Sequence, residues 1–163
     1  MKPQPKKKNT VAVQVPVQIV KEKKYKGLGL IIFIVAALLY ANTFHHEWVL
    51  DDYGSFKLNI YVTAGTNGYH DILTKTYRHG SGFYTDNLYR PLSQLMFATE
   101  WQLSPDNPGL YHAISVFYYA LACTLLFFFL RRLLKKYNLW IPFFIALLFA
   151  AHPIHTEVVA NIK

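Results

Sequence analysis

The sequence predicts an all-α membrane protein with about three transmembrane helices and a large outside loop of helices and irregular segments. Three observations support this prediction. Apolar residues make up 53% of the 163 residues, more than a typical soluble domain contains. Many of them are gathered in long runs without charges, and clusters of basic residues lie directly beside two of these runs. This arrangement is typical of transmembrane helices with cytoplasmic flanks.

Residues 1–26 form the first predicted segment, a disordered basic tail on the cytoplasmic side. Eight lysines lie in this tail, and its first 20 residues show no helical periodicity. The net charge of +8 could also attract nucleic acid. However, the basic residues flank apolar runs, and no nucleic-acid-binding motif accompanies them. The sequence therefore favours a lipid bilayer as the partner and argues against nucleic acid.

Residues 27–44 form the first predicted span. No charged residue lies between Lys26 and Glu47, and the run is long enough to cross a hydrocarbon core about 30 Å thick. A cleaved signal peptide is the alternative interpretation. The long basic tail and the absence of a clear small-residue cleavage site favour a retained signal anchor.

Two further spans are predicted near the end of the chain. Residues 110–130 form the clearest apolar run, which ends at Arg131 and Arg132. Residues 131–138 form a basic loop, and residues 139–152 form a third run that is short for a crossing and fits a short or tilted span.

The two basic clusters set the predicted orientation. Because Lys and Arg favour the cytoplasmic side, the N-terminus and residues 131–138 are expected inside. Residues 45–109 are then the outside loop, and residues 153–163 begin a second one. We expect an integral protein of a bacterial plasma membrane. The acidic pair Asp51–Asp52 and the segment His152–Glu157 would share the outer face.

The outside loop is expected to contain an amphipathic helix that begins at Pro91, a residue suited to the first turn of a helix. Its apolar side chains recur at helical spacing and define one face. That face comprises Leu92, Leu95, Met96, Thr99 and Leu103. We expect this helix to lie along the membrane interface.

The acidic pair Asp51–Asp52 is the sharpest chemical feature. A carboxylate at the end of a span lies where water is scarce, so its pKa can rise toward that of a general base. The alternative is that one Asp caps a helix that includes Phe56 and Ile60. The spacing alone favours capping.

Arg90 precedes the predicted helix start, where a guanidinium and free backbone N–H groups could bind a phosphate. The alternative is an interfacial arginine that reaches lipid phosphates, and the residues alone favour it. His112 lies just inside the second span, where ionisable side chains usually face a polar cavity.

His152, His155 and Glu157 resemble a metal-ligand cluster in content. The spacing of the two histidines, with a proline after the first, does not match a helical zinc motif. A polar helix end is the favoured interpretation. No metal site is therefore predicted, although the reaction considered below leaves room for a divalent metal.

Taken in order, four features resemble the N-terminal part of the transmembrane and tetratricopeptide repeat-containing proteins. They are the acidic pair after the first span and the segments Tyr89–Leu92, Tyr111–His112 and His152–Ala160. That family consists of membrane glycosyltransferases of the type C fold, related to protein O-mannosyltransferases. The resemblance extends over nearly the whole chain from Gly27 onward, and its last segment is the most specific.

The resemblance implies a partial type C glycosyltransferase fold and a sugar donor linked to polyprenyl phosphate. It implies transfer of that sugar, possibly mannose, to a hydroxyl group of a protein on the outer face. Asp51 or Asp52 would be the catalytic acid-base residue, and Arg90 would bind the lipid phosphate. By the same resemblance, His112, His152, His155 and Glu157 would line the substrate cavity.

The family is expected to have many more spans, usually followed by tetratricopeptide repeats. The sequence is therefore interpreted as a fragment that would be inactive alone. A different class of function is also open, because the acidic, aromatic outside loop would serve equally well as the binding surface of a non-catalytic membrane scaffold.

Overall fold

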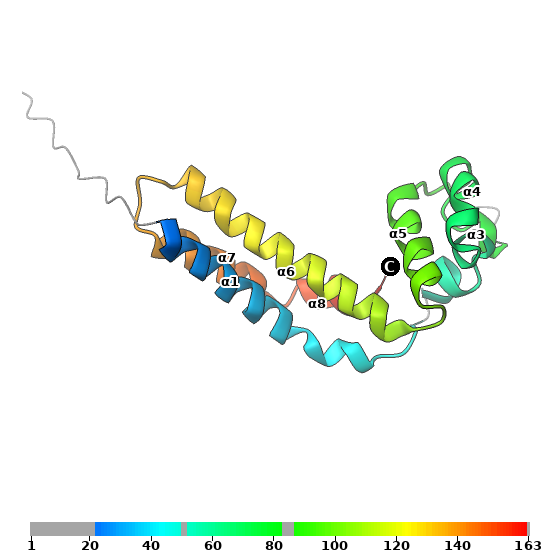
Figure 1. Cartoon of the computed structure of the whole chain (residues 1–163), viewed down its shortest axis with the longest axis horizontal. Coiled ribbons are helices and arrows are strands. Elements are labelled where there is room, and N and C mark those ends of the chain that lie inside the picture. Colours follow the sequence, from blue (N-terminus) through cyan, green and yellow to red (C-terminus); the bar gives the residue numbers. More distant parts are fainter. Residues whose placement is uncertain (1–21, 50–51, 83–86, 163) are drawn as a thin grey trace, which may run out of the picture.

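The computed structural model describes residues 22–49, 52–82 and 87–162. Every regular element in these residues is helical, so the predicted all-α class is confirmed. Three helices lie side by side, and a group of shorter helices is gathered at one end of them (Figure 1). The three are α1 (Glu22–Leu39), α6 (Pro108–Leu133) and α7 (Trp140–Ala150).

Helix α6 agrees closely with the predicted span at residues 110–130. It starts at Pro108, and the side chain of Asn107 caps it by accepting a hydrogen bond from the Leu110 backbone N–H at 3.4 Å. In the part of the chain that is described, α6 alone is long and apolar enough to cross a membrane. The apolar parts of α1 and α7 are shorter, so the first and third spans stay predictions.

Small residues at the contacts allow the three helices to pack closely. The shared core is fully buried at Ala36 on α1, at Ala120 and Cys123 on α6, and at Ala146 and Ala150 on α7. Larger side chains on the opposite faces point outward, as expected of helices surrounded by lipid. The most exposed of them are Leu30, Leu38, Phe129, Leu133 and Leu148.

The segment between α1 and α6 folds into short helical elements. They are η1 (Ala41–His45), η2 (Tyr53–Lys57), α3 (Ile60–Thr63), η3 (Gly65–Gly68), α4 (Tyr69–Thr74), η4 (His79–Ser81) and α5 (Pro91–Leu103). Their core is aromatic: the ring of Phe56 lies 4.0 Å from that of Phe97, and Trp48 lies 5.0 Å from Tyr111 at the start of α6. Ile162 joins this core, so a residue near the C-terminal end of the described chain stabilises the segment between α1 and α6.

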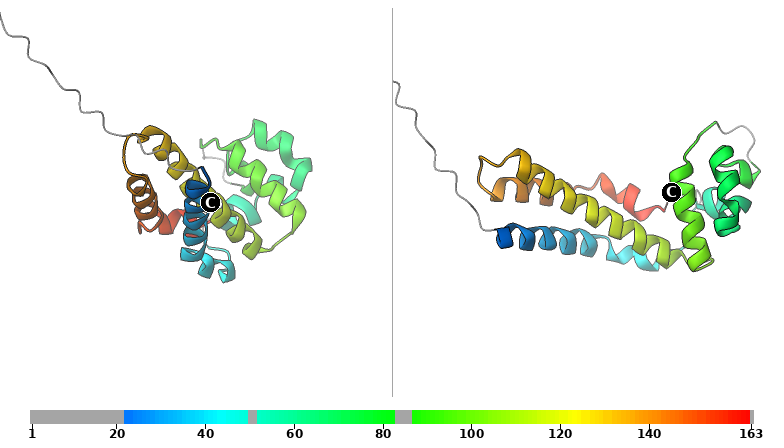
Figure 2. Two further views of the ribbon diagram at one scale, coloured as in Figure 1. Left: turned by 60° about the vertical axis from the view of Figure 1, so that its left-hand side comes forward. Right: turned by 45° about the horizontal axis from the view of Figure 1, so that its top comes forward.

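Helix α5 starts at Pro91, as predicted, and crosses the end of α6 at a steep angle (Figures 1 and 2). The face predicted from its leucines points outward, since Leu92 and Leu103 are each 73% exposed. Phe97 and Glu100 on another face are buried instead. An outward apolar face on a helix that crosses α6 fits a position along the membrane surface.

Candidate functional site

Asp52 is enclosed near the start of the segment between α1 and α6, with 1% of its surface exposed. Its Oδ2 atom accepts a hydrogen bond from the backbone N–H of Val49 at 2.9 Å. The side chain does not cap η2, the element that follows it. The capping interpretation is therefore wrong for Asp52, because its carboxylate turns back toward the preceding residues. Asp51 lies outside the described residues.

Tyr77 is a buried side chain that the sequence did not single out, and its backbone is held from three directions. The Tyr77 N–H donates to the carbonyl of Leu88 at 2.7 Å. The Tyr77 carbonyl accepts from the side-chain amide of Asn59 at 3.1 Å and from that of Gln94 on α5. These bonds join α5 to the segment before α3 and fix the ring of Tyr77 at their junction.

Charged groups from three parts of the loop influence the pKa of the Tyr77 hydroxyl. Burial is the main influence and raises the pKa of Tyr77. The hydroxyl of Ser55 and the positive charges of Arg90 and Arg78 oppose this shift, while the negative charge of Asp52 adds to it. The structure thus brings two predicted residues, Asp52 and Arg90, into one electrostatic neighbourhood.

The two arginines give this neighbourhood an anion-binding character. Arg90 immediately precedes α5, and its carbonyl accepts a hydrogen bond from the Ser93 hydroxyl at 3.1 Å. The Nε atom of Arg78 is buried and has no hydrogen-bond partner among the described residues. Two guanidinium groups beside a helix N-terminus can bind a phosphate through several charge-assisted hydrogen bonds.

His112 lies in the first turns of α6 and is completely buried. Its ring packs edge to face against that of His46, with ring centres 5.8 Å apart. Neither ring nitrogen of His112 has a hydrogen-bond partner in the part of the chain that the structure describes. We expect a ligand or a water molecule to form hydrogen bonds with this histidine, because a buried polar group without a hydrogen-bond partner destabilises the folded protein.

His152, His155 and Glu157 lie where α7 ends and α8 (His155–Ala160) begins. The His155 ring packs against Phe149 at 4.4 Å and Tyr119 at 5.5 Å. Nδ1 of His152 accepts a hydrogen bond from the Ile154 N–H at 3.2 Å, and Glu157 is exposed. Among the described residues no group of three potential ligands could hold a metal ion.

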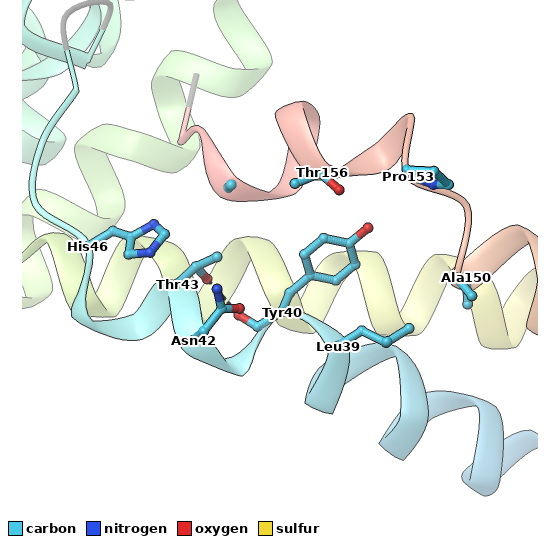
Figure 3. Close-up of a pocket in the computed structure, with 10 residues that line it drawn as sticks. Leu39, Tyr40, Asn42, Thr43, His46, Ala150, Pro153 and Thr156 are labelled. Atoms are coloured by element: carbon cyan, nitrogen blue, oxygen red, sulfur yellow. Dashed lines mark hydrogen bonds between the residues drawn. The ribbon is translucent and has the colours of Figure 1, made fainter.

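Beside α8 lies a cleft of about 280 Å³, with α8 on one side and the end of α1 on the other (Figure 3). Pro153 and Thr156 line it from the motif His152–Ala160, and His46 lines it from the other side. The resemblance had singled out the motif His152–Ala160 but not its partner His46, because the cleft joins segments more than 100 positions apart. Tyr77 and Arg78 were missed, because only the folded loop brings Tyr77 into the electrostatic neighbourhood of Asp52 and the two arginines.

Comparison with known proteins finds relatives that share the name protein O-mannosyl-transferase. No model of a known protein family matches the chain, and no solved structure matches it. The chain is 35% identical to the protein O-mannosyl-transferase TMTC2 of Homo sapiens over 127 residues, which are 76% of this chain and 15% of that protein. It is 32% identical to TMTC1 of Homo sapiens over 139 residues, 83% of this chain and 16% of that protein.

A third relative is the protein O-mannosyl-transferase TMTC3 of Mus musculus, 38% identical over 74 residues, which are 45% of this chain and 8% of that protein. The chain thus spans about 15% of the length of the curated relatives that it matches over most of its residues. The matches to TMTC2 and TMTC1 cover 76% and 83% of this chain. They confirm the resemblance seen in the sequence, and the chain belongs to the family of transmembrane and tetratricopeptide repeat-containing protein O-mannosyl-transferases.

Proposed function

We propose that the whole protein is a membrane glycosyltransferase with a type C fold and that this chain supplies its first three spans and first outside loop. The donor would be a sugar linked to polyprenyl phosphate, and the acceptor a hydroxyl group of a protein on the outer face. Mannose is the sugar that the names of the relatives support. A bilayer partner is supported by α6, which is long and apolar enough to cross a membrane.

The observation that carries the proposal is the shared neighbourhood of Asp52, Arg90 and Arg78 around the hydroxyl of Tyr77. Transfer to a hydroxyl group needs a base for the proton and a cation for the departing phosphate. The enclosed carboxylate of Asp52 would act as the base, and the guanidinium groups of Arg90 and Arg78 would act as the cation.

In the proposed step, the acceptor oxygen attacks the anomeric carbon while its proton passes to the Asp52 carboxylate. The new bond joins the acceptor oxygen to this carbon, and the bond from the carbon to the phosphate oxygen breaks. The electron pair of the broken bond stays with the lipid phosphate, whose charge Arg90 and Arg78 stabilise. The sugar therefore changes its anomeric configuration once.

The test is transfer from a polyprenyl-phosphate mannose donor by membranes that contain the full protein. We expect Asp52→Asn to lower the rate by about 10²–10⁴-fold, because an amide cannot accept the proton. The amide oxygen can still accept the hydrogen bond from Val49, so the protein level should stay near that of the wild type.

Asp71→Asn is the matched control, because this acid lies in the same loop and is only partly buried. It should retain transfer. Equal turnover by Asp52→Asn and wild-type protein would show that Asp52 is not the base, and the same substitution at Asp51 would then test the other acid.

A further inference from the structure

A second cleft lies between α5, α6 and α8 and shares no lining residue with the cleft shown in Figure 3. One face of α5 forms one wall through Met96, Phe97 and Glu100, and the first half of α6 forms another. Val158 and Val159 line the cleft from α8. The volume of about 350 Å³ lies within the range of small-molecule pockets, about 300–1,000 Å³. The cleft can therefore hold a small ligand or one end of a longer molecule.

Glu100 is a buried acid in the wall of this cleft, and the proposed transfer step does not use it. Only 6% of Glu100 is exposed, and no described residue forms a hydrogen bond or an ion pair with its carboxyl group. Burial is the cause that raises the pKa of this carboxyl from 4.5 to about 7. Glutamates are almost never buried so deeply without a partner, because an unpaired carboxylate loses its hydration and gains nothing in return. A partner from outside the described residues would remove this cost.

The rest of the lining contains no group that could pair with Glu100 as an ion. Its polar groups are the hydroxyls of two serines and two tyrosines, and its other residues are apolar. The titratable groups near Glu100 are phenols on α6: Tyr111, which feels the charge of Glu100, and Tyr118 and Tyr119, which line the cleft. From α8 the lining has only valines. A cation that entered the cleft would therefore meet one carboxylate and no competing positive charge.

The cleft opens where the membrane surface is expected. The outward apolar face of α5 fits a position along that surface, and α6 is long and apolar enough to cross the membrane. Tyr118 lines the cleft and is 49% exposed, and its neighbour Phe117 is 51% exposed. An amphiphile could thus place its polar head beside Glu100 while its apolar chain stays in the lipid.

We propose that this cleft binds a lipophilic primary amine, an organic ammonium ion with an apolar chain, through an ion pair with Glu100. The ammonium group is the partner that the buried carboxylate lacks, and it donates charge-assisted hydrogen bonds to the carboxylate. The rings of Tyr118 and Tyr119 can attract the cation, and Phe97 and Ile114 contact the first carbons of the chain. The inference goes beyond the proposed function, because it assigns a second ligand and a second site.

The chemistry of the lining argues against other ligands. A phosphate or a carboxylate would meet the negative charge of Glu100 and no cation. A metal ion would need several acidic or histidine ligands, whereas the lining has one acid and no histidine. A polyol would leave most of its hydroxyl groups against apolar side chains without hydrogen-bond partners. A single positive charge on an apolar body is the class that fits.

The first experiment is photolabelling of the full protein in its membrane with dodecylamine that carries a diazirine near its amino group. We expect labels within residues 93–100, 114–119 and 158–162, the segments that line the cleft. Unlabelled dodecylamine should compete, whereas dodecanol of the same length and without charge should not. Glu100→Gln should lower the competed labelling at least about tenfold, because the amide cannot form the ion pair. The matched control is Glu47→Gln, since Glu47 is exposed, and it should label like the wild type.

The second experiment follows the apparent Kd for dodecylamine in wild-type protein from pH 5 to 8. An aliphatic amine stays charged over this range, because its pKa is near that of lysine, about 10.4. Glu100 in the empty cleft is protonated below about pH 7, so each bound amine displaces one proton. We expect the Kd to fall about tenfold for each pH unit up to about pH 7 and then to level off. In Glu100→Gln this dependence should disappear.

Ser115→Leu tests the cleft even where Glu100→Gln does not fold, because it narrows the cleft from α6 and leaves Glu100 in place. It should reduce competed labelling as well. A Kd that is independent of pH between 5 and 7, or labelling that persists unchanged in both variants, would overturn the proposed site. Absence of competed labelling in the full protein would show that another part of the protein covers Glu100 and would equally overturn it.

Discussion

Replacing Glu100 with glutamine should remove a pH-dependent loss of stability from the outside segment. Glu100 lies on α5 and is only 6% exposed, and no described residue forms a hydrogen bond with its carboxyl group. Burial raises the pKa of Glu100 from its ordinary value of 4.5 to about 7. The folded protein therefore prefers the protonated form, because a buried carboxylate loses hydration without gaining a partner.

The sign and size of the effect follow from this difference. Between pH 4.5 and about 7 the folded chain binds more protons at Glu100 than the unfolded chain. The free energy of unfolding thus falls as pH rises through this window, and the loss is complete above about pH 7. At about 1.36 kcal/mol for each pH unit, the loss is about 3 kcal/mol at most, and the partial exposure of Glu100 to solvent reduces it. Glutamine carries no charge and avoids this loss.

The assay is thermal unfolding of the purified chain in detergent, followed by tryptophan fluorescence from pH 4.5 to 8. The difference in Tm between Glu100→Gln and the wild type isolates the contribution of this residue. We expect this difference to grow in favour of the variant as pH rises, while the exposed Glu47→Gln shows a flat difference. A variant that is less stable than the wild type at pH 8 would refute the reasoning.

Three further predictions concern folding and orientation. Phe56→Ala should lower the free energy of unfolding by about 3–5 kcal/mol in denaturant titrations, because its fully buried ring centres the aromatic core; a loss below about 1 kcal/mol would contradict this. Gly68→Ala should reduce the yield of folded protein, since its Cβ would lie 1.9 Å from a backbone carbonyl oxygen; normal yield and Tm would show that the segment adapts. With Cys123 replaced by alanine, Lys75→Cys should react with an impermeant thiol reagent in intact cells and Lys135→Cys only after permeabilisation; the reverse pattern would overturn the proposed orientation.

Much of the fold was predictable because its signals are local. The apolar run at residues 110–130 indicated α6, and Pro91 indicated the start of α5. The orientation of α5 was harder to predict, because helical periodicity defines an apolar face but does not show which part of the protein contacts it. Leu92 and Leu103 are exposed, whereas Glu100 is buried against neighbouring helices.

The candidate site was predictable only in part. Position beside an apolar run was enough to single out Asp52, and position before a helix was enough for Arg90. Their common neighbour Tyr77 depends on hydrogen bonds to two residues about 17 positions away on either side, which no local pattern records. The capping interpretation of Asp52 was wrong because its side chain bonds to a preceding N–H, and sequence spacing does not distinguish the two directions.

The hydrogen bonds at Tyr77 have a consequence for how the family can diversify. They close the base of the segment from Arg78 to Asn87, since the backbone of Tyr77 is tied to Leu88 and to α5. Residues inserted after Gly82 would not alter these hydrogen bonds, because the bonds lie at the base of the segment and a longer loop adds little to the cost of closing it. The places of Asp52 and Arg90 would therefore tolerate such insertions, provided that Tyr77 keeps its bonds to Leu88 and Gln94.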